Sequence, residues 1–137
     1  MTQDRSESTT VDVPTQRRVN HIVAVFNTLD IDAIVALFSE NAVVAYTDCP
    51  PLHGRDALRA FIEPRYADLV DYRLTKRVRL QQQAWVGIEG EALYRLRSEG
   101  PDGRQYRTRL FEFLEFRDDL ISRWDYVGNT SLVPINA

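Results

Sequence analysis

The chain has 137 residues, a length that suits one domain with a single buried core. Its composition is that of an ordinary globular protein, with 44% hydrophobic and 10% aromatic residues, and its formal charge of -3 lacks the basic excess that nucleic-acid binding requires. One cysteine excludes an internal disulfide and suits a reducing cytoplasm. One cysteine and two histidines cannot build a zinc site without carboxylate ligands. We therefore expect a cytoplasmic protein with no metal, no cofactor and no nucleic-acid partner.

The first part of the chain is predicted to be helical after a short tail. Residues 1–14 are polar and lack an apolar run, so we expect a flexible tail rather than a signal peptide or a membrane anchor. Apolar residues at helical spacing predict an amphipathic helix over residues 16–28. Asp30 is a suitable N-cap for a short second helix, whose predicted buried face includes Leu37 and Phe38.

A strand and a third helix are predicted next. The run AVVAYTDC, residues 42–49, is rich in residues that favour a pleated surface, and the two prolines after it end the strand. Gly54 precedes a predicted helix over residues 55–69, in which Pro64 kinks or ends the regular part.

The remainder of the chain predicts a sheet, because the hydrophobic period changes to two from residue 72. Turn signals at IEG, EGPDG and RDD favour an antiparallel meander. Helices before strands indicate one α+β domain over residues 15–131, with three helices packed on a strongly curved mixed or antiparallel sheet and a tail at 132–137. The predicted strands cover about residues 73–87, 91–98, 104–117 and 120–128.

The outer face of this sheet is also predicted to be covered. Strands such as TRLFEFLEF carry apolar residues on both faces, whereas a solvated face should be polar. A homodimer that packs sheet against sheet is the simplest cover.

Three stretches carry a family resemblance: FNTLDIDAIVALFSENAVVAYTD, LHGRDALRAFI and LISRWDYVGN. Over about residues 16–130 the chain resembles the nuclear transport factor 2-like superfamily, the cone-shaped fold of SnoaL-like polyketide cyclases, steroid delta-isomerases and limonene epoxide hydrolases. The resemblance implies a deep pocket between the helices and the concave face of the sheet. It names no reaction, because this fold carries isomerases, dehydratases, hydrolases, cyclases and inert binding modules.

The site residues that the resemblance implies match only in part. Ile22 stands where steroid isomerases have a helix tyrosine, and Tyr46 stands at the position of their catalytic aspartate, with Asp48 two residues further along the strand. The acid that those enzymes place on a sheet strand falls on Glu112. The RWDY sequence puts Asp125 where SnoaL-like cyclases use an acid-base aspartate. The arginine and aspartates of the epoxide hydrolases are incomplete here.

Each candidate also has a structural interpretation. Asp48 is a general base at the mouth of an apolar pocket, or it caps the turn before the prolines. Tyr46 donates to a developing oxyanion, or it is a half-buried aromatic at the rim. Glu112 donates to a substrate carbonyl in its protonated form, or it pairs with an arginine of a neighbouring strand. His53 is an acid-base group at the entrance, or a solvent-facing loop residue.

Strand alternation separates Asp125 from its neighbours. Trp124 and Tyr126 share one face of their strand and Asp125 the other, so the aromatics and the carboxylate cannot all line the cavity without a bulge. We place the aromatics inside and expect Asp125 to pair with an arginine. The predicted substrate wall, which is plain core in the alternative interpretation, consists of Ile22, Phe26, Phe61, Tyr66, Trp85, Trp124 and Tyr126.

The leading hypothesis is a cofactor-independent enzyme that acts by acid-base chemistry on a hydrophobic small molecule, as an isomerase, cyclase or dehydratase of secondary metabolism. Asp48 would move the proton, and Tyr46 and Glu112 would stabilise an enolate-like oxygen. A non-catalytic binding or dimerisation module of the same fold is the first alternative, and an epoxide hydrolase is the second.

Overall fold

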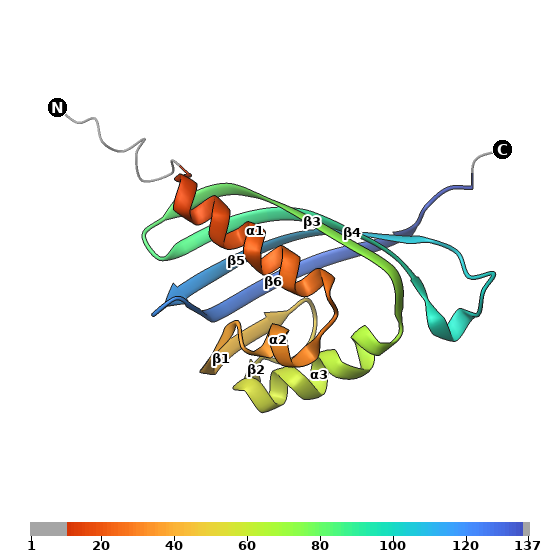
Figure 1. Cartoon of the computed structure of the whole chain (residues 1–137), viewed down its shortest axis with the longest axis horizontal. Coiled ribbons are helices and arrows are strands. Elements are labelled where there is room, and N and C mark those ends of the chain that lie inside the picture. Colours follow the sequence, from red (N-terminus) through yellow and green to blue (C-terminus); the bar gives the residue numbers. More distant parts are fainter. Residues whose placement is uncertain (1–10, 136–137) are drawn as a thin grey trace.

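The computed structural model describes residues 11–135, in which three α-helices lie against a six-stranded mixed sheet (Figure 1). The strand order is β2-β1-β6-β5-β4-β3, and β1 runs parallel to β6 while the other neighbours are antiparallel. The predicted α+β architecture is therefore confirmed. The elements are α1 (Val13–Asn27), α2 (Ile31–Val35), β1 (Phe38–Tyr46), β2 (Leu52–His53), α3 (Arg55–Ala67), β3 (Leu69–Gln82), β4 (Trp85–Leu96), a short 3-10 helix (Arg97–Glu99), β5 (Tyr106–Arg117) and β6 (Leu120–Leu132).

The first helix begins earlier than its hydrophobic pattern predicts. The Asp12 carboxylate accepts a hydrogen bond from the Thr15 backbone N–H at 2.8 Å, and Pro14 occupies the first turn, where its missing N–H costs nothing. The Asp12 backbone N–H also donates to the Gln81 side chain on β3 at 3.0 Å. The helix thus starts inside the predicted tail, of which residues 1–10 lie outside the described part of the chain.

The join between helix and strand lies a few residues before its predicted place. Asp30 caps α2 as predicted, accepting from the Ala33 N–H at 3.2 Å, but α2 ends at Val35. Phe38 is fully buried as the first residue of β1, not as the end of a helix face. The same strand ends at Tyr46, because Thr47 adopts a left-handed backbone with φ of 47° that breaks the extended conformation.

The turn predicted at IEG, residues 88–90, is wrong. The chain reverses at residues 83–84, and β4 continues straight through the three residues. A Cβ atom on Gly90 would lie 2.7 Å from the Thr75 carbonyl oxygen and 3.0 Å from Cγ of Lys76. This glycine therefore marks a close approach between β3 and β4, and it leaves space for the Lys76 side chain.

The sheet has one buried and one open face. Helix α1 packs against β3, and α3 packs against β1 and β2, so the helices cover the concave face (Figure 1). On β5, Leu110 and Leu114 are buried on that face. Phe111 and Phe113, on the opposite face, are 56% and 50% exposed. Among the described residues, no helix is long and apolar enough to cross a membrane.

Candidate functional site

A cavity of about 420 Å³ lies between the helices and the concave face of the sheet. Phe26 of α1, Trp124 of β6 and aliphatic side chains such as Leu74 and Leu110 supply an apolar lining. The exposed side chain of Arg65, on α3, also lines the cavity and marks its open end. Five hydroxyl-bearing rings complete the wall: Tyr46, Tyr66, Tyr72, Tyr94 and Tyr126. Such a space suits an organic molecule with a hydrophobic skeleton and few oxygens.

One member of a buried ion pair, Lys76, lines this cavity, and its partner Glu112 lies beside it without being part of the lining. Lys76 Nζ of β3 donates to Glu112 Oε2 of β5 at 2.5 Å, and the two side chains are 4% and 0% exposed. The other carboxylate oxygen, Oε1, accepts from the Trp124 indole N–H at 2.9 Å. Glu112 is thus inward-facing, as predicted, but its cationic partner is a lysine and not an arginine.

The backbone explains how this pair forms across three strands. Lys76 pairs with Gly90 in the β3–β4 register, and Gly90 pairs with Leu110 in the β4–β5 register. Because Gly90 has no side chain, Lys76 can extend over β4 towards Glu112, two residues beyond Leu110 on β5. Lys76 is also the only lysine among the 17 lysine and arginine residues of the chain.

The surroundings of the Lys76 ammonium are aromatic. Its Nζ lies 5.2 Å from the centroid of the Phe26 ring and 5.9 Å from that of Trp124. Within the described contacts, Glu112 is the hydrogen-bond acceptor of this ammonium, so further N–H bonds remain to be used by a ligand oxygen. The arrangement offers a positive charge with directed donors in an apolar space, where such groups interact more strongly than in water.

The tyrosine hydroxyls are held in their neutral form. Burial raises the pKa of Tyr46, Tyr66, Tyr72 and Tyr126 above the ordinary value. The rings of Tyr46 and Tyr126 are stacked with their centroids 4.1 Å apart. These phenols therefore keep their protons around neutral pH and can serve as hydrogen-bond donors to a ligand.

One tyrosine is tied into a smaller polar network. The Tyr94 hydroxyl lies 2.9 Å from Thr108 Oγ1, which in turn lies 2.7 Å from Thr130 Oγ1. This chain of hydroxyls crosses from β4 to β6 and satisfies the buried Thr108.

The structure brings five of the residues expected at the site to the cavity wall: Phe26, Tyr46, Tyr66, Trp124 and Tyr126. Two others lie behind or beside that wall. Ile22 is buried in the core on α1, and the Phe61 ring packs against Tyr46 at a centroid distance of 4.9 Å. They shape the cavity through their neighbours and do not line it.

Asp48, His53 and Trp85 lie elsewhere. Asp48 is exposed in the turn after β1, because the left-handed residue Thr47 interrupts the alternation that would have kept it on the face of Tyr46. His53 is exposed on the short edge strand β2. Trp85 lies at the β3–β4 hairpin, at the start of β4. The expectation that Asp48 and His53 flank the pocket is therefore wrong in its geometry.

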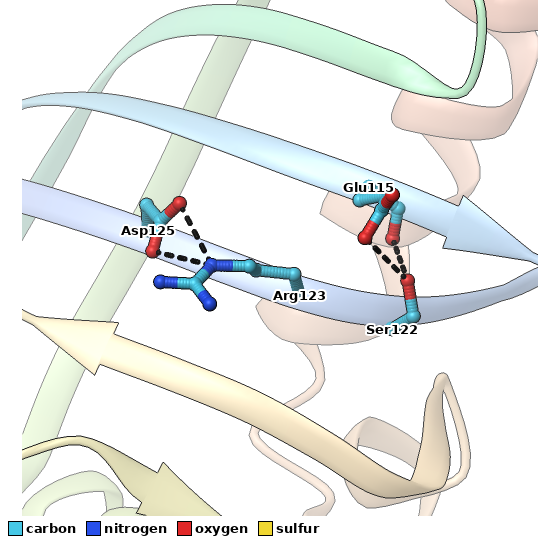
Figure 2. Close-up of polar contacts among 4 residues, drawn as sticks. All are labelled: Glu115, Ser122, Arg123 and Asp125. Atoms are coloured by element: carbon cyan, nitrogen blue, oxygen red, sulfur yellow. Dashed lines mark hydrogen bonds and ion pairs between the residues drawn. The ribbon is translucent and has the colours of Figure 1, made fainter.

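Asp125 points away from the cavity, on the outer face of β6. Both of its oxygens accept from the Arg123 Nε at 3.1 Å (Figure 2), which confirms the expected pairing with an arginine. Next to Arg123 on β6, Ser122 Oγ donates to the Glu115 carbonyl oxygen of β5 at 3.0 Å (Figure 2). With Trp124 and Tyr126 buried, the aromatic face is the inner one, as predicted.

Lys76 is the candidate site residue that the sequence reasoning missed. Two signals could have found it: it is the sole lysine of an arginine-rich chain, and it alternates with the apolar residues Leu74 and Val78 on one face of β3. Within residues 11–135, no cluster of three or more histidine, cysteine, aspartate or glutamate side chains could hold a metal ion.

Comparison with known proteins places this geometry in a family. The family model of the SnoaL-like domain matches residues 19–124. A search of curated proteins found no significant match. Among solved structures, an epoxide hydrolase/cyclase-like enzyme with a role in pyran ring formation in the polyether salinomycin is similar, with a TM-score of 0.73 and 16% identity over 96% of this chain and 100% of that one.

Two further structures are similar in fold. A candidate polyketide cyclase from Pseudomonas putida KT2440 has a TM-score of 0.65 and 20% identity, over 83% of this chain and 90% of that one. A candidate isomerase from Bacillus subtilis has a TM-score of 0.69 and 20% identity, over 82% of this chain and 84% of that one. The match to the family model spans most of the described domain, and the chain belongs to the SnoaL-like domain family.

Proposed function

We propose that the protein binds a hydrophobic small molecule that carries a carbonyl group, and that it transforms this molecule by acid-base chemistry as an isomerase, cyclase or dehydratase. The observation that carries the proposal is Lys76, which lines an apolar cavity and is paired with the buried Glu112. The ligand skeleton contacts the aromatic wall, and its oxygen contacts the ammonium.

The energetics of the pair favour a functional role over a purely structural one. Removing two charges from water costs several kcal/mol each, so a buried pair adds little to stability compared with apolar side chains of the same volume. Lys76 and Glu112 are nearly or fully inaccessible, yet their neighbours Leu74, Leu110 and Leu114 show that the surroundings accept aliphatic residues. A pair retained at such a cost is expected to act on a ligand.

The chemistry follows from the donors at this place. When a base removes a proton next to a carbonyl group, negative charge develops on the oxygen, and preorganised donors lower the barrier. The Lys76 ammonium supplies such a donor, and Glu112 lies within hydrogen-bond distance to exchange protons with it. Tyr46, a neutral phenol at the cavity wall, supplies a further donor to the same molecule. Here Tyr46 keeps the role expected from the sequence. Lys76 takes the oxygen-stabilising role that was expected of Glu112, and Glu112 takes the proton-transfer role that was expected of Asp48.

The family and fold agree with this reaction class. The match to the SnoaL-like domain supports a protein that converts small molecules, and the similar structures include a candidate cyclase, a candidate isomerase and an epoxide hydrolase/cyclase-like enzyme. Because these structures share only 16–20% identity with this chain, they support the fold and leave the choice of substrate to the cavity itself.

Epoxide hydrolysis is supported less well by the same residues. A water molecule that attacks an epoxide must be held by free carboxylate oxygens. Both oxygens of Glu112 are occupied by Lys76 and Trp124, and both oxygens of Asp68, the acid that lines the cavity, accept from Ser98. Carbonyl chemistry uses the donor that is present and needs no free carboxylate at the start.

We also propose that a second copy of the chain covers the outer face of the sheet. Leu80, Phe111, Phe113 and Val127 are exposed there, around a groove of about 470 Å³. Charged groups of both signs, including the Arg123–Asp125 pair, surround this apolar patch, so a symmetric contact can place acids against bases. This dimer would leave the cavity on the opposite face accessible.

The test of the proposed function uses 2-tetralone, a bicyclic ketone with acidic protons next to its carbonyl group. Binding is followed by quenching of Trp124 fluorescence in a Trp85→Phe background, since Trp85 lies away from the cavity. Proton transfer is followed by NMR as deuterium exchange in heavy water. We expect saturable quenching and exchange above the buffer rate, and Ala92→Phe, which fills the cavity, should abolish both. Binding without exchange would support the non-catalytic module instead, and absence of binding would contradict the proposal.

A further inference from the structure

We propose that Lys76 is a catalytic nucleophile that forms an imine with its substrate, which makes the substrate class a ketone or aldehyde on a hydrophobic skeleton. This inference rests on the proposed function of the same cavity. It adds a covalent intermediate to that function, and it requires the primary amine of the Lys76 side chain.

The choice of residue is the first argument. Every other ion pair among residues 11–135 uses an arginine as its cation, including the pairs of Arg107 with Glu91 and Arg123 with Asp125. Arginine suits buried ion pairs better than lysine, because its charge is delocalised and more weakly hydrated. The single lysine of the chain lines the cavity, where its amine can reach a ligand. An amine can attack a carbonyl carbon, whereas a guanidinium cannot.

The surroundings of Nζ are the second argument. Lys76 lies between aromatic rings and is 4% exposed, so water has little access to the amine except through the cavity. Imine formation releases water, and the reverse reaction consumes it, so a site that excludes water favours the intermediate. Glu112 is fixed by the Trp124 indole and remains beside the nitrogen throughout.

The proposed step balances in atoms and charge. Glu112 takes one proton from the Lys76 ammonium, and the nitrogen lone pair forms a C–N bond as the C=O π pair moves to oxygen. Glu112 returns its proton to that oxygen, which gives a carbinolamine. A second proton passes from nitrogen through Glu112 to the hydroxyl group, the C–O bond breaks, and water leaves. The products are a protonated imine, the Glu112 carboxylate and one water molecule.

The charge pattern of the site is unchanged by this step. The protonated imine carries the positive charge that the ammonium carried, so the ion pair with Glu112 persists. The cation then withdraws electrons from the neighbouring carbon. When the Glu112 carboxylate takes a proton from the carbon next to the imine carbon, the C–H pair becomes the C=C bond of an enamine and the C=N π pair moves to nitrogen. The nitrogen is then neutral and Glu112 is protonated, and isomerisation or ring closure can proceed from this enamine.

The experiment traps the imine on the full-length wild-type chain. The protein is incubated with 2-tetralone and sodium cyanoborohydride, and in parallel with 2-naphthaldehyde, a more electrophilic probe. Reduction of the imine leaves a stable secondary amine, whose mass exceeds that of the protein by the mass of the carbonyl compound less one oxygen atom. Peptide mapping distinguishes Lys76 from the N-terminal amine, which serves as an internal reference for unassisted labelling.

We expect labelling of Lys76 to exceed that of the N-terminal amine by at least about tenfold, because the bound carbonyl is held beside the nitrogen. Lys76→Arg, which keeps the charge but cannot form an imine, should lose this label while circular dichroism shows the same fold. If both probes quench Trp124 but neither labels Lys76, the imine is overturned while the proposed cavity function stands. If neither probe binds, both proposals are contradicted.

Discussion

The two faces of the sheet carry the same kind of ion pair in opposite settings. On the concave face, Lys76 and Glu112 are 4% and 0% exposed, and on the outer face Arg123 and Asp125 are 42% and 34% exposed. The outer pair can exchange its hydrogen bonds with water, so its net contribution to stability is small. The inner pair has no such exchange, so each charge depends on the other. Burial therefore decides how strongly each charge depends on its partner.

The largest effect is expected when one charge is removed from the inner pair. Lys76→Met leaves the buried Glu112 without its cation, and we expect it to lower the free energy of unfolding by about 3–5 kcal/mol. The double variant Lys76→Met with Glu112→Leu should recover most of this loss, because it removes both charges and keeps apolar volume. Urea unfolding measures each value. A single variant as stable as the wild type would show that the pair is not buried as described.

Alkaline pH tests the tyrosines of the concave face. Burial raises the pKa of Tyr66, Tyr72 and Tyr126 in the folded state, so they stay protonated while the unfolded chain loses those protons near pH 10. The stabilisation is complete below that pH and falls as pH rises above it, by about 1.4 kcal/mol per pH unit for each such tyrosine. Urea unfolding at several pH values between about 9 and about 11 measures the slope of the unfolding free energy against pH. Tyr72→Phe should make it shallower, and a flat profile would refute the burial of these phenols.

Alanine substitutions at two glycines of β4, Gly90 and Gly87, test the concave and the outer face separately. Gly90→Ala places a methyl group 2.7 Å from a backbone oxygen and against the Lys76 stem, so we expect a loss of about 1–3 kcal/mol together with slower ketone exchange. Gly87→Ala meets mainly the tip of Leu80, which is exposed and can move. Thermal unfolding and the exchange assay measure both variants. Equal effects of the two would argue against the role of Gly90 in admitting Lys76.

The outer face is tested by a charge in its apolar patch. Phe113→Glu should weaken the proposed dimer by at least about tenfold in dissociation constant, because half-exposed aromatic residues dominate such contacts. Sedimentation velocity over a range of concentrations measures this change. Ile135→Glu, at an exposed site outside the patch, is the control. A wild-type chain that is monomeric at all concentrations would refute this interface.

The smallest effect is expected at the outer ion pair. Asp125→Asn removes the partner of Arg123 where both groups reach water, so stability should change by less than about 1 kcal/mol. Deuterium exchange of 2-tetralone should keep the wild-type rate, since Asp125 does not face the cavity. A large loss of exchange would restore Asp125 as a candidate acid-base residue.

Strand alternation was the part of the sequence that predicted the site well. The period of two placed Trp124 and Tyr126 inside, Asp125 outside and Glu112 inside, because successive side chains of a strand must point to opposite faces. The pattern fails where the backbone leaves the extended conformation. At Thr47 a left-handed residue ends the strand, and Asp48 turns to solvent.

Local sequence patterns do not predict which side chains of distant strands come into contact. Lys76 and Glu112 are 36 residues apart in sequence, and their meeting depends on the register of β3, β4 and β5. Glycine is common in turns, so the sequence predicts a turn at Gly90. In the structure the missing side chain of Gly90 leaves room for Lys76 to extend across β4. A glycine inside an otherwise regular strand is better taken as a sign of close approach.

The most direct test of the cavity as the reactive centre is deuterium exchange of 2-tetralone by the double variant Lys76→Met with Glu112→Leu. This variant is expected to stay folded, so a change in rate reports on chemistry and not on stability. We expect saturable exchange by the wild type and exchange at the buffer rate by the folded double variant. A double variant that exchanges as fast as the wild type would contradict it.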